Sequence, residues 1–191
     1  MLRWIILYAL LAAVLFIFTS WMVTKSEGIE SKVFRLTLML TGILFLGVMV
    51  LVIPFIPQPR LENFYLQYLI GIPLAIIGMA LRVYPMLYFK RKGTRSDLVK
   101  PSKLVTTGPY GLVRHPQYAA GIIFIIGWFL IWGGIYSFYV LTLVIIAIFF
   151  QALIEEKYIL EKEFADEYLE YKKKVGMFFP KIIRNKNFIR D

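Results

Sequence analysis

Hydrophobic residues form five long stretches, separated by shorter polar segments. The stretches cover residues 2–23, 33–56, 64–89, 118–132 and 135–154. About 20 apolar residues cross the hydrocarbon core as an α-helix, and the shorter fourth stretch either extends over residues 115–117 or lies partly in the interface. Only Gly133 and Gly134 separate the last two stretches, so we expect an antiparallel hairpin. The pattern predicts an all-α, polytopic integral membrane protein with five transmembrane helices.

A second apolar pattern follows the fifth stretch. Leu160, Phe164, Tyr168, Tyr171 and Val175 recur at spacings of four, four, three and four residues, which is one face of a helix. We expect an amphipathic C-terminal helix that continues from the fifth stretch or lies along the membrane surface. Since the chain shows no internal repeat and no composition boundary, residues 1–191 form a single membrane domain.

Composition narrows the class of protein. Hydrophobic residues make up 59% of the chain, and there are no cysteines and one histidine. Disulfides and thiolate metal sites are therefore excluded, and we expect no metal site. The net charge of +10 suits either nucleic acid or anionic lipid, and the long apolar stretches favour lipid. The sequence contains no glycine-rich phosphate loop and no nucleophile elbow.

The basic residues are distributed unevenly about the five stretches. With the N-terminus outside, the cytoplasmic segments are 24–35, 89–118 and 155–191, and they hold 19 of the 22 Lys and Arg residues. Basic residues concentrate on the cytoplasmic side of membranes. We therefore expect a multi-pass protein of the cell membrane whose C-terminus and tail helix are cytoplasmic. Arg82 lies inside the third stretch and either snorkels to the membrane edge or lines a substrate cavity.

Two polar motifs lie at the boundaries of the last two stretches. Arg114 and His115 precede Pro116, which suits the first turn of a helix. Glu155 and Glu156 follow the fifth stretch, and charges at the hydrocarbon edge need partners. The hairpin brings both motifs to the same end, so we expect Arg114, His115 and Glu156 to be neighbours. From the residues alone, His115 is either part of a site or an ordinary interfacial side chain.

Together these segments resemble the isoprenylcysteine carboxyl methyltransferase family, to which phospholipid methyltransferases are related. The resemblance covers about residues 90–180 and suggests a compact prokaryotic or archaeal member. It rests on the run from Leu104 to Tyr110, on Arg114-His115-Pro116-Gln117-Tyr118, and on Glu155-Glu156 with Leu160, Phe164, Tyr168 and Tyr171. The Arg-His-Pro-x-Tyr and Glu-Glu motifs are fairly specific as a pair, whereas either alone is weak.

The resemblance implies S-adenosylmethionine as the methyl donor. The cofactor contacts that it implies are Arg95, Ser102, Lys103, Leu104, Val105, Tyr110, His115, Pro116, Gln117, Tyr118 and Glu156. It further suggests catalytic roles for Arg114, which would orient a substrate carboxylate, and for Glu156, which would accept hydrogen bonds from the ribose or the amino group of the cofactor. Residues 1–60 would then supply two N-terminal spans, and residues 61–191 the methyltransferase core with its cofactor pocket.

Two positions depart from the family pattern. Ala152 stands where members that act on prenylcysteine have an arginine, one turn before the motif glutamate. This leaves the methyl acceptor open among a prenylcysteine carboxylate, a phospholipid amine, a quinone and another small lipophile. Ala165 stands where the family has a glycine, and we expect the tail helix to run on through it.

The expected function is methyl transfer from S-adenosylmethionine to a lipophilic or prenylated acceptor by an integral membrane enzyme. Because a charged donor and an apolar acceptor meet at the boundary between water and lipid, the polar motifs belong at the ends of the apolar stretches. The expected partners are this substrate and membrane lipid, with no nucleic acid. The alternatives are a membrane enzyme that resembles sterol reductases and uses NADPH, and a non-enzymatic membrane subunit.

Overall fold

The computed structural model describes residues 2–25, 40, 44, 47–48, 50–62, 64–92, 96–97, 100–101 and 103–181. Almost all the regular structure in these ranges is helical. The elements are α1 (Leu2–Lys25), η2 (Ile53–Phe55), α3 (Phe64–Arg91), β1 (Ser96–Asp97), β2 (Lys100–Pro101), α4 (Pro109–Leu112), α5 (Pro116–Trp132), α6 (Ile135–Glu155), η3 (Glu156–Leu160) and α7 (Glu161–Lys174). The two short strands pair antiparallel and are the one departure from the all-α expectation within the described residues.

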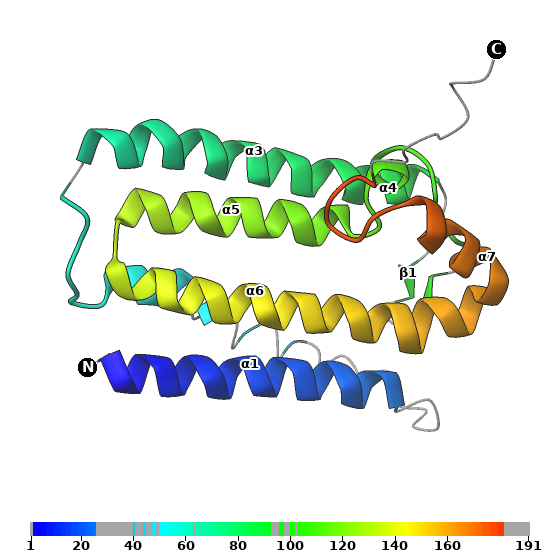
Figure 1. Ribbon diagram of the computed structural model, residues 1–191, viewed down its shortest axis with the longest axis horizontal. Helices are drawn as coiled ribbons and strands as arrows, with labels where there is room; N and C mark the ends of the chain where they lie inside the picture. The colour runs from blue at the N-terminus through cyan, green and yellow to red at the C-terminus, as the bar shows by residue number, and fades with distance from the viewer. Residues whose placement is uncertain are drawn as a thin grey trace, which may run out of the picture.

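The long helices α1, α3, α5 and α6 lie side by side as a bundle (Figure 1). Helix α5 runs antiparallel to both α3 and α6, and Gly133 takes a left-handed conformation with φ of 61° between α5 and α6. The predicted hairpin is therefore confirmed. Helix α5 starts at Pro116, two residues before the fourth apolar stretch. This agrees with the first of the two alternatives, in which residues 115–117 extend that stretch. Helix α4, β1 and α7 lie together at one end of the bundle.

Three described helices are long and apolar enough to cross a membrane: Leu2–Thr19 within α1, Tyr65–Phe89 within α3, and the continuous helix Ile135–Lys174. Helix α5 is equally apolar but has 17 residues, which corresponds to about 25 Å. The second predicted stretch, 33–56, lies largely outside the described residues.

Helices α6, η3 and α7 follow one another without a loop, and the chain changes direction at the kink of Ala165. The 21 residues of α6 correspond to about 30 Å, which is the thickness of the hydrocarbon core. The apolar part ends at Glu155, and the turn of π-helix η3 leads into the polar α7. Helix α7 therefore extends outside the hydrocarbon layer.

Helix α7 and the residue after it bury apolar side chains on one side. Tyr168, Tyr171 and Val175 are buried and pack with Leu104, Leu160 and Phe164. This small core attaches α7 to the loop before α4. The tail helix thus covers the end of the bundle at which the two polar motifs lie.

Helix α7 does not run on regularly through Ala165, as the sequence analysis expected. Ala165 has φ of 41° and ψ of −118°, and the helix kinks there. The expectation treated alanine as a good helix former, but the turn at this point requires the conformation that a glycine would adopt freely. The packing of Tyr168 and Tyr171 beyond the kink outweighs the local preference of Ala165.

Glycines allow α3 and α5 to approach each other closely. A β-carbon at Gly78 would overlap the backbone of Phe124, and one at Gly127 would overlap the backbone of Ala75. Small residues are the usual means of close helix packing in membranes. The close contact fixes α5, and therefore the motif at its start, against α3.

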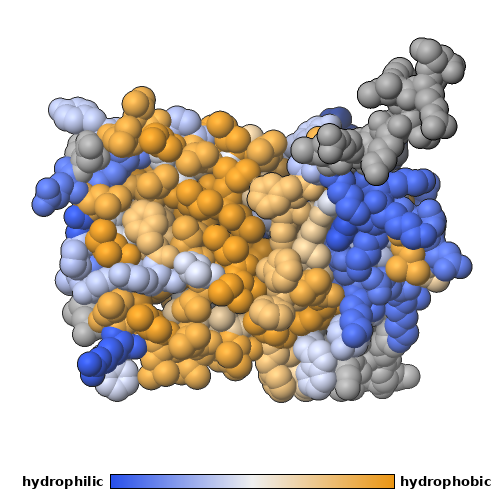
Figure 2. Space-filling model, in the orientation of Figure 1, coloured by the Kyte–Doolittle hydropathy of each residue, from blue (hydrophilic) through white to orange (hydrophobic). Residues whose placement is uncertain are grey.

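The outer surface of the bundle is apolar along its middle and polar at the α7 end. Trp4, Tyr65, Leu69 and Ile76 are among the large apolar side chains that are exposed. In Figure 2 apolar residues form a broad belt, and hydrophilic residues cover the end where α4 and α7 lie. Such a belt matches a lipid environment, because exposed apolar area on this scale is rare on monomeric soluble proteins.

Candidate functional site

The two polar motifs meet at the α7 end of the bundle. Nε of Arg114 donates a hydrogen bond of 2.8 Å to Oε1 of Glu156, and Nε2 of His115 lies 3.1 Å from the same oxygen. Arg114 and His115 precede α5, while Glu156 follows α6. The predicted proximity of these three residues, which rested on the hairpin, is therefore confirmed.

Glu156 is the centre of a buried ion cluster. Its side chain is 1% exposed, and Nζ of Lys172 lies 3.1 Å from its second carboxylate oxygen, without the alignment of a hydrogen bond. Burial raises the pKa of Glu156, but hydrogen bonds from His115 and Arg114 and the charge of Arg114 outweigh burial and lower the pKa to about 2. Glu156 is therefore ionised throughout the physiological range, and its oxygens are engaged by protein groups.

The segment that follows α7 pairs with the backbone of the histidine motif. The backbone N–H groups of Arg114 and His115 donate to the carbonyls of Gly176 and Met177, at 2.8 and 3.0 Å. The guanidinium of Arg114 also donates to the carbonyl of Val175. Residues 175–177 thus form a strap across the start of α5. The side chain of Arg114 binds both this strap and Glu156.

Glu155 differs from its neighbour in both contacts and exposure. The hydroxyl of Tyr118 donates to Oε2 of Glu155 at 2.7 Å, and Nδ1 of His115 lies 4.0 Å from that oxygen. The rings of His115 and Tyr118 are stacked with centroids 5.3 Å apart. Since the side chain of Glu155 is 33% exposed, it presents a carboxylate that a ligand can reach.

Helix α4 adds a third polar group to the site. The amide of Gln117 donates to the hydroxyl of Tyr110 at 3.2 Å, and the carbonyl of Tyr110 accepts from the hydroxyl of Tyr171 at 2.6 Å. Burial raises the pKa of Tyr110, so its hydroxyl stays protonated near neutral pH. Tyr110 and Gln117 therefore form a hydrogen-bonding edge that connects α4 to the first turn of α5.

The other predicted contacts differ in burial. Val105 is buried, and Leu104 packs against Tyr168, Tyr171 and Val175. Pro116 is buried in the first turn of α5. Lys103 is exposed. Arg95 and Ser102 lie outside the described residues, so their predicted contacts stay predictions.

Several residues of the cluster were not identified from the sequence. Lys172 belongs to α7, and no spacing rule connects position 172 with position 156. Tyr171 was predicted only as part of the apolar face of that helix. The carbonyls of residues 175–177 act through the backbone and carry no side-chain signal. Glu155 could have been identified, because it is half of the acidic pair at the end of the fifth stretch. The family resemblance, however, implied a site role for Glu156.

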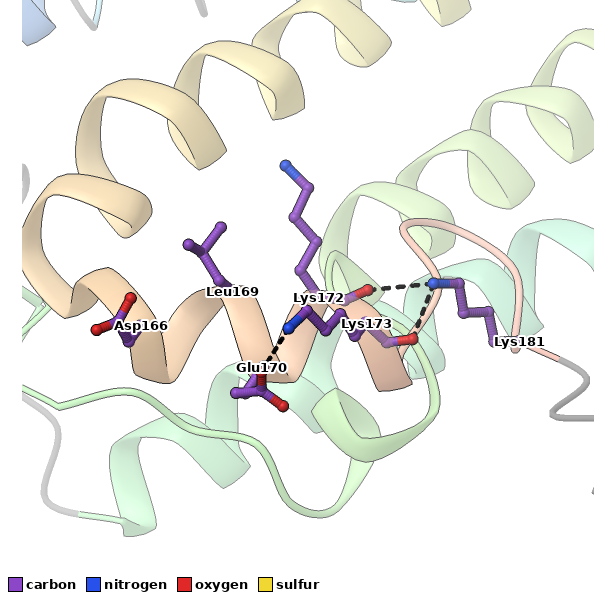
Figure 3. A pocket seen from close by; sticks show the side chains of 6 residues that line it. All are labelled: Asp166, Leu169, Glu170, Lys172, Lys173 and Lys181. Atoms are coloured by element: carbon purple, nitrogen blue, oxygen red, sulfur yellow. Dashed lines mark hydrogen bonds and ion pairs between the residues drawn. The ribbon is translucent and has the colours of Figure 1, made fainter.

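A cavity of about 420 Å³ lies beside α7 rather than at the motif cluster. Asp166, Leu169, Glu170, Lys172, Lys173 and Lys181 line it. Figure 3 shows Lys172 pointing away from Lys173 and Glu170, while Lys181 reaches the carbonyls at the end of α7. Because Lys181 serves as a helix cap and Lys173 pairs with Glu170, this cavity is the surface of the tail helix and not a separate catalytic pocket.

The donor set at the motif cluster fits a cofactor with an adenine ring, ribose hydroxyls and an amino-acid group. Glu155 offers a reachable carboxylate, and Tyr110, Gln117 and Tyr118 offer hydroxyl, amide and ring surfaces. Oε1 of Gln151, one residue before Ala152 on α6, is buried without a hydrogen-bond partner in the described part of the chain. A buried polar atom without a partner is costly unless a ligand or water satisfies it.

Comparison with known proteins agrees with this site. The family model for phospholipid methyltransferases matches residues 66–167. Relatives include a probable protein-S-isoprenylcysteine O-methyltransferase of Oryza sativa subsp. indica, which is 30% identical over 64% of this chain and 65% of its own length. Another is the protein-S-isoprenylcysteine O-methyltransferase of Schizosaccharomyces pombe, which is 36% identical over 44% of this chain and 35% of its own.

A third relative is named for a different role. The nickel-cobalt-cadmium resistance protein NccN of Alcaligenes xylosoxydans xylosoxydans is 27% identical over 60% of this chain and 48% of its own length. The chain spans slightly less than two thirds of the rice relatives that it matches. No solved structure matches it. The matched residues 66–167 include most of α3, all of α5 and α6, and both polar motifs, and they cover more than half of the chain. The chain therefore belongs to the phospholipid methyltransferase family, and its resemblance to isoprenylcysteine carboxyl methyltransferases is confirmed.

Proposed function

We propose that this protein is an integral membrane methyltransferase that uses S-adenosylmethionine to methylate a lipophilic acceptor. The observation that carries the proposal is the meeting of Arg114, His115, Glu155 and Glu156 at the polar end of an apolar helix bundle. This is where a charged donor and a lipid-soluble acceptor can both arrive. The family and the names of the relatives support the same reaction class.

The proposed membrane arrangement has five spans, an outside N-terminus, and a cytoplasmic site and tail helix. Helices α1, α3, α5 and α6 would supply four spans, with α5 thinning the bilayer locally or tilting little, because it is short. The fifth span would come from residues 33–56, which the structure largely leaves undescribed. The concentration of basic residues at the α7 end supports the orientation.

We assign cofactor contact to the reachable side of the cluster. When bound, S-adenosylmethionine supplies an electrophilic methyl group on a sulfonium. Glu155 would accept hydrogen bonds from ribose or amino groups, and Tyr118 and His115 would hold the amino-acid part near the start of α5. Tyr110 and Gln117 provide the edge that orients the ligand. The unused oxygen of Gln151 lies on the same helix as Glu155 and offers a further acceptor.

Arg114 and Glu156 act as positioning residues in this proposal. Both are largely buried, with side chains 7% and 1% exposed, and each binds the other. Arg114 also holds the strap of residues 175–177. Their role is to fix the first turn of α5 and the end of α6 in one geometry, since alignment of the reacting groups contributes much of the rate in such transfers.

The acceptor belongs to the class of lipid-soluble molecules with a nucleophilic oxygen or nitrogen. The relatives from rice and fission yeast are named for prenylcysteine carboxyl groups, while the family name points to phospholipids. Ala152 is fully buried on α6, and its methyl side chain has no polar group for a substrate. We propose a prenylcysteine-like carboxylate as the first acceptor to test, with phospholipid amines as the second.

The test is methyl transfer by protein purified in detergent. Labelled S-adenosylmethionine is supplied with N-acetyl-S-farnesylcysteine or with phosphatidylethanolamine, and lipid-extractable label is counted. We expect label in at least one product. Thermal stabilisation is measured in parallel with S-adenosylhomocysteine and with NADPH. Stabilisation by NADPH alone would refute the proposal in favour of a reductase, and a folded protein that neither transfers label nor responds to S-adenosylhomocysteine would refute it in favour of a non-enzymatic subunit.

A further inference from the structure

Arg82 is a charged side chain on the apolar part of α3. It lies seven residues before Phe89, where the apolar span Tyr65–Phe89 ends, and this corresponds to about 10 Å along the helix. Its side chain is exposed, so it faces the region that lipid occupies around the bundle. A guanidinium at this depth is costly to maintain, and such residues usually face a partner or a pathway.

The guanidinium of Arg82 makes no hydrogen bond or ion pair with any residue that the structure describes. Snorkelling to the α7 end also runs against the geometry of the helix, because Cα–Cβ bonds tilt toward the N-terminus and α3 ends at the α7 end. The side chain instead lies against α5 at Gly121, where a β-carbon would come within 2.9 Å of Nη1. The absence of a side chain at Gly121 leaves a notch that admits the guanidinium.

This notch is next to the motif cluster. Gly121 lies one helical turn after Tyr118 on α5. The hydroxyl of Tyr118 donates to Glu155. The guanidinium of Arg82 at Gly121 therefore lies about one helical turn from the tyrosine that contacts the reachable carboxylate of the site.

From this geometry we propose that Arg82 binds the anionic oxygen group of the acceptor, a carboxylate or a phosphate carried on an apolar chain. The apolar chain would lie in the lipid along α3, and the anionic group would enter the notch at Gly121 beside Tyr118. A guanidinium presents paired donors that match such groups. The inference rests on the proposed function and adds the acceptor's charge and its side of entry.

The experiment compares charged and neutral probes that share an apolar chain. Binding of N-acetyl-S-farnesylcysteine and its carboxamide, and of farnesyl phosphate and farnesol, is measured by scintillation proximity competition on protein in detergent. We expect the unmodified protein to prefer the anionic member of at least one pair by about tenfold, which corresponds to one charge-assisted hydrogen-bonded pair. The pair with the larger preference identifies carboxylate or phosphate as the natural group.

In Arg82→Gln we expect the preference to fall to within about twofold, and in Arg82→Lys to be intermediate, because lysine keeps the charge without the paired donors. Arg91→Gln is the matched control, since Arg91 is exposed on the same helix, nine residues on and on the opposite face. It should keep the preference. An unchanged preference in Arg82→Gln, or no preference in the unmodified protein, would overturn the inference.

Binding of S-adenosylhomocysteine by the same preparations separates the two proposals. Anion preference that depends on Arg82, without cofactor binding, would refute the proposed function and leave the anion site standing. Cofactor binding without anion preference would refute the role of Arg82 alone.

Discussion

Glu155 and Glu156 are adjacent in the chain, but the fold gives them different surroundings. Glu156 is enclosed by Arg114, His115 and Lys172, whereas Glu155 contacts Tyr118 and is one third exposed. Successive residues on a helix point about 100° apart. The carboxylate of Glu156 therefore faces Arg114, while that of Glu155 faces Tyr118. We therefore assign a structural role to Glu156 and contact with the ligand to Glu155.

Paired substitutions test this division. Glu156→Gln leaves the charges of Arg114 and Lys172 without their buried partner, and we expect a loss of about 3 kcal/mol in stability, seen as a lower Tm in detergent. Glu155→Gln should leave Tm nearly unchanged and weaken S-adenosylhomocysteine binding by about tenfold or more, as expected for a lost charged hydrogen bond. The division is refuted if Glu155→Gln lowers Tm more than Glu156→Gln does.

The stability of the cluster should also depend on pH. The pKa of Glu156 is lowered in the folded protein to about 2, against about 4.3 in an unfolded chain. Its contribution is therefore present above pH of about 4.3 and is lost as the pH falls through this value toward 2. We expect Tm of the unmodified protein to fall more steeply than Tm of Glu156→Gln between those limits. Parallel curves for the two proteins would contradict this.

The residues that hold the site were only partly predictable from the sequence. The two-residue link at Gly133-Gly134 brought Arg114, His115 and Glu156 to one end, because an antiparallel hairpin leaves no other arrangement. Lys172 could not be predicted, since its place depends on how α7 packs after the kink at Ala165. The carbonyls that bind Arg114 could not be predicted either, because any residue type can supply them.

At the scale of elements, hydropathy accounts for the helices and packing accounts for their irregularities. Helices α1, α3 and α6 follow the apolar stretches closely. The one signal for the kink in α7 was the glycine that the family has at position 165, because alanine itself favours a regular helix. The kink arises where the helix turns to bury Tyr168 and Tyr171 against Leu104 and the loop before α4.

This kink predicts a stabilising substitution. Ala165 has a φ of 41°, which glycine adopts without steric cost. Such a conformation destabilises a protein by about 1–3 kcal/mol when the residue is not glycine. We expect Ala165→Gly to raise Tm, by a gain of about 1 kcal/mol after the entropy of glycine is included. Ala80→Gly, on the exposed face of α3, is the control and should lower Tm. A drop in Tm for Ala165→Gly would show that the left-handed turn is absent.

At the scale of the whole molecule, an apolar belt is combined with a strongly polar end at α7. The belt is lined by exposed aromatic and aliphatic side chains, and the polar end contains α4, α7 and the motif cluster (Figures 1 and 2). The proposed number of spans and their proposed orientation rest on the hydropathy and charge patterns. The arrangement of α7 over the site does not, because it depends on a small core formed by residues far apart in the sequence.

The central claim is that the cluster at the polar end binds S-adenosylmethionine. Isothermal titration of S-adenosylhomocysteine into protein purified in detergent tests it most directly, with NADPH as the comparison ligand and Glu155→Gln as the site variant. We expect saturable binding at one site per chain, weaker by about tenfold or more in Glu155→Gln, and no binding of NADPH. Folded protein that binds no S-adenosylhomocysteine, or that binds it equally well after Glu155→Gln, would refute the assignment of this site.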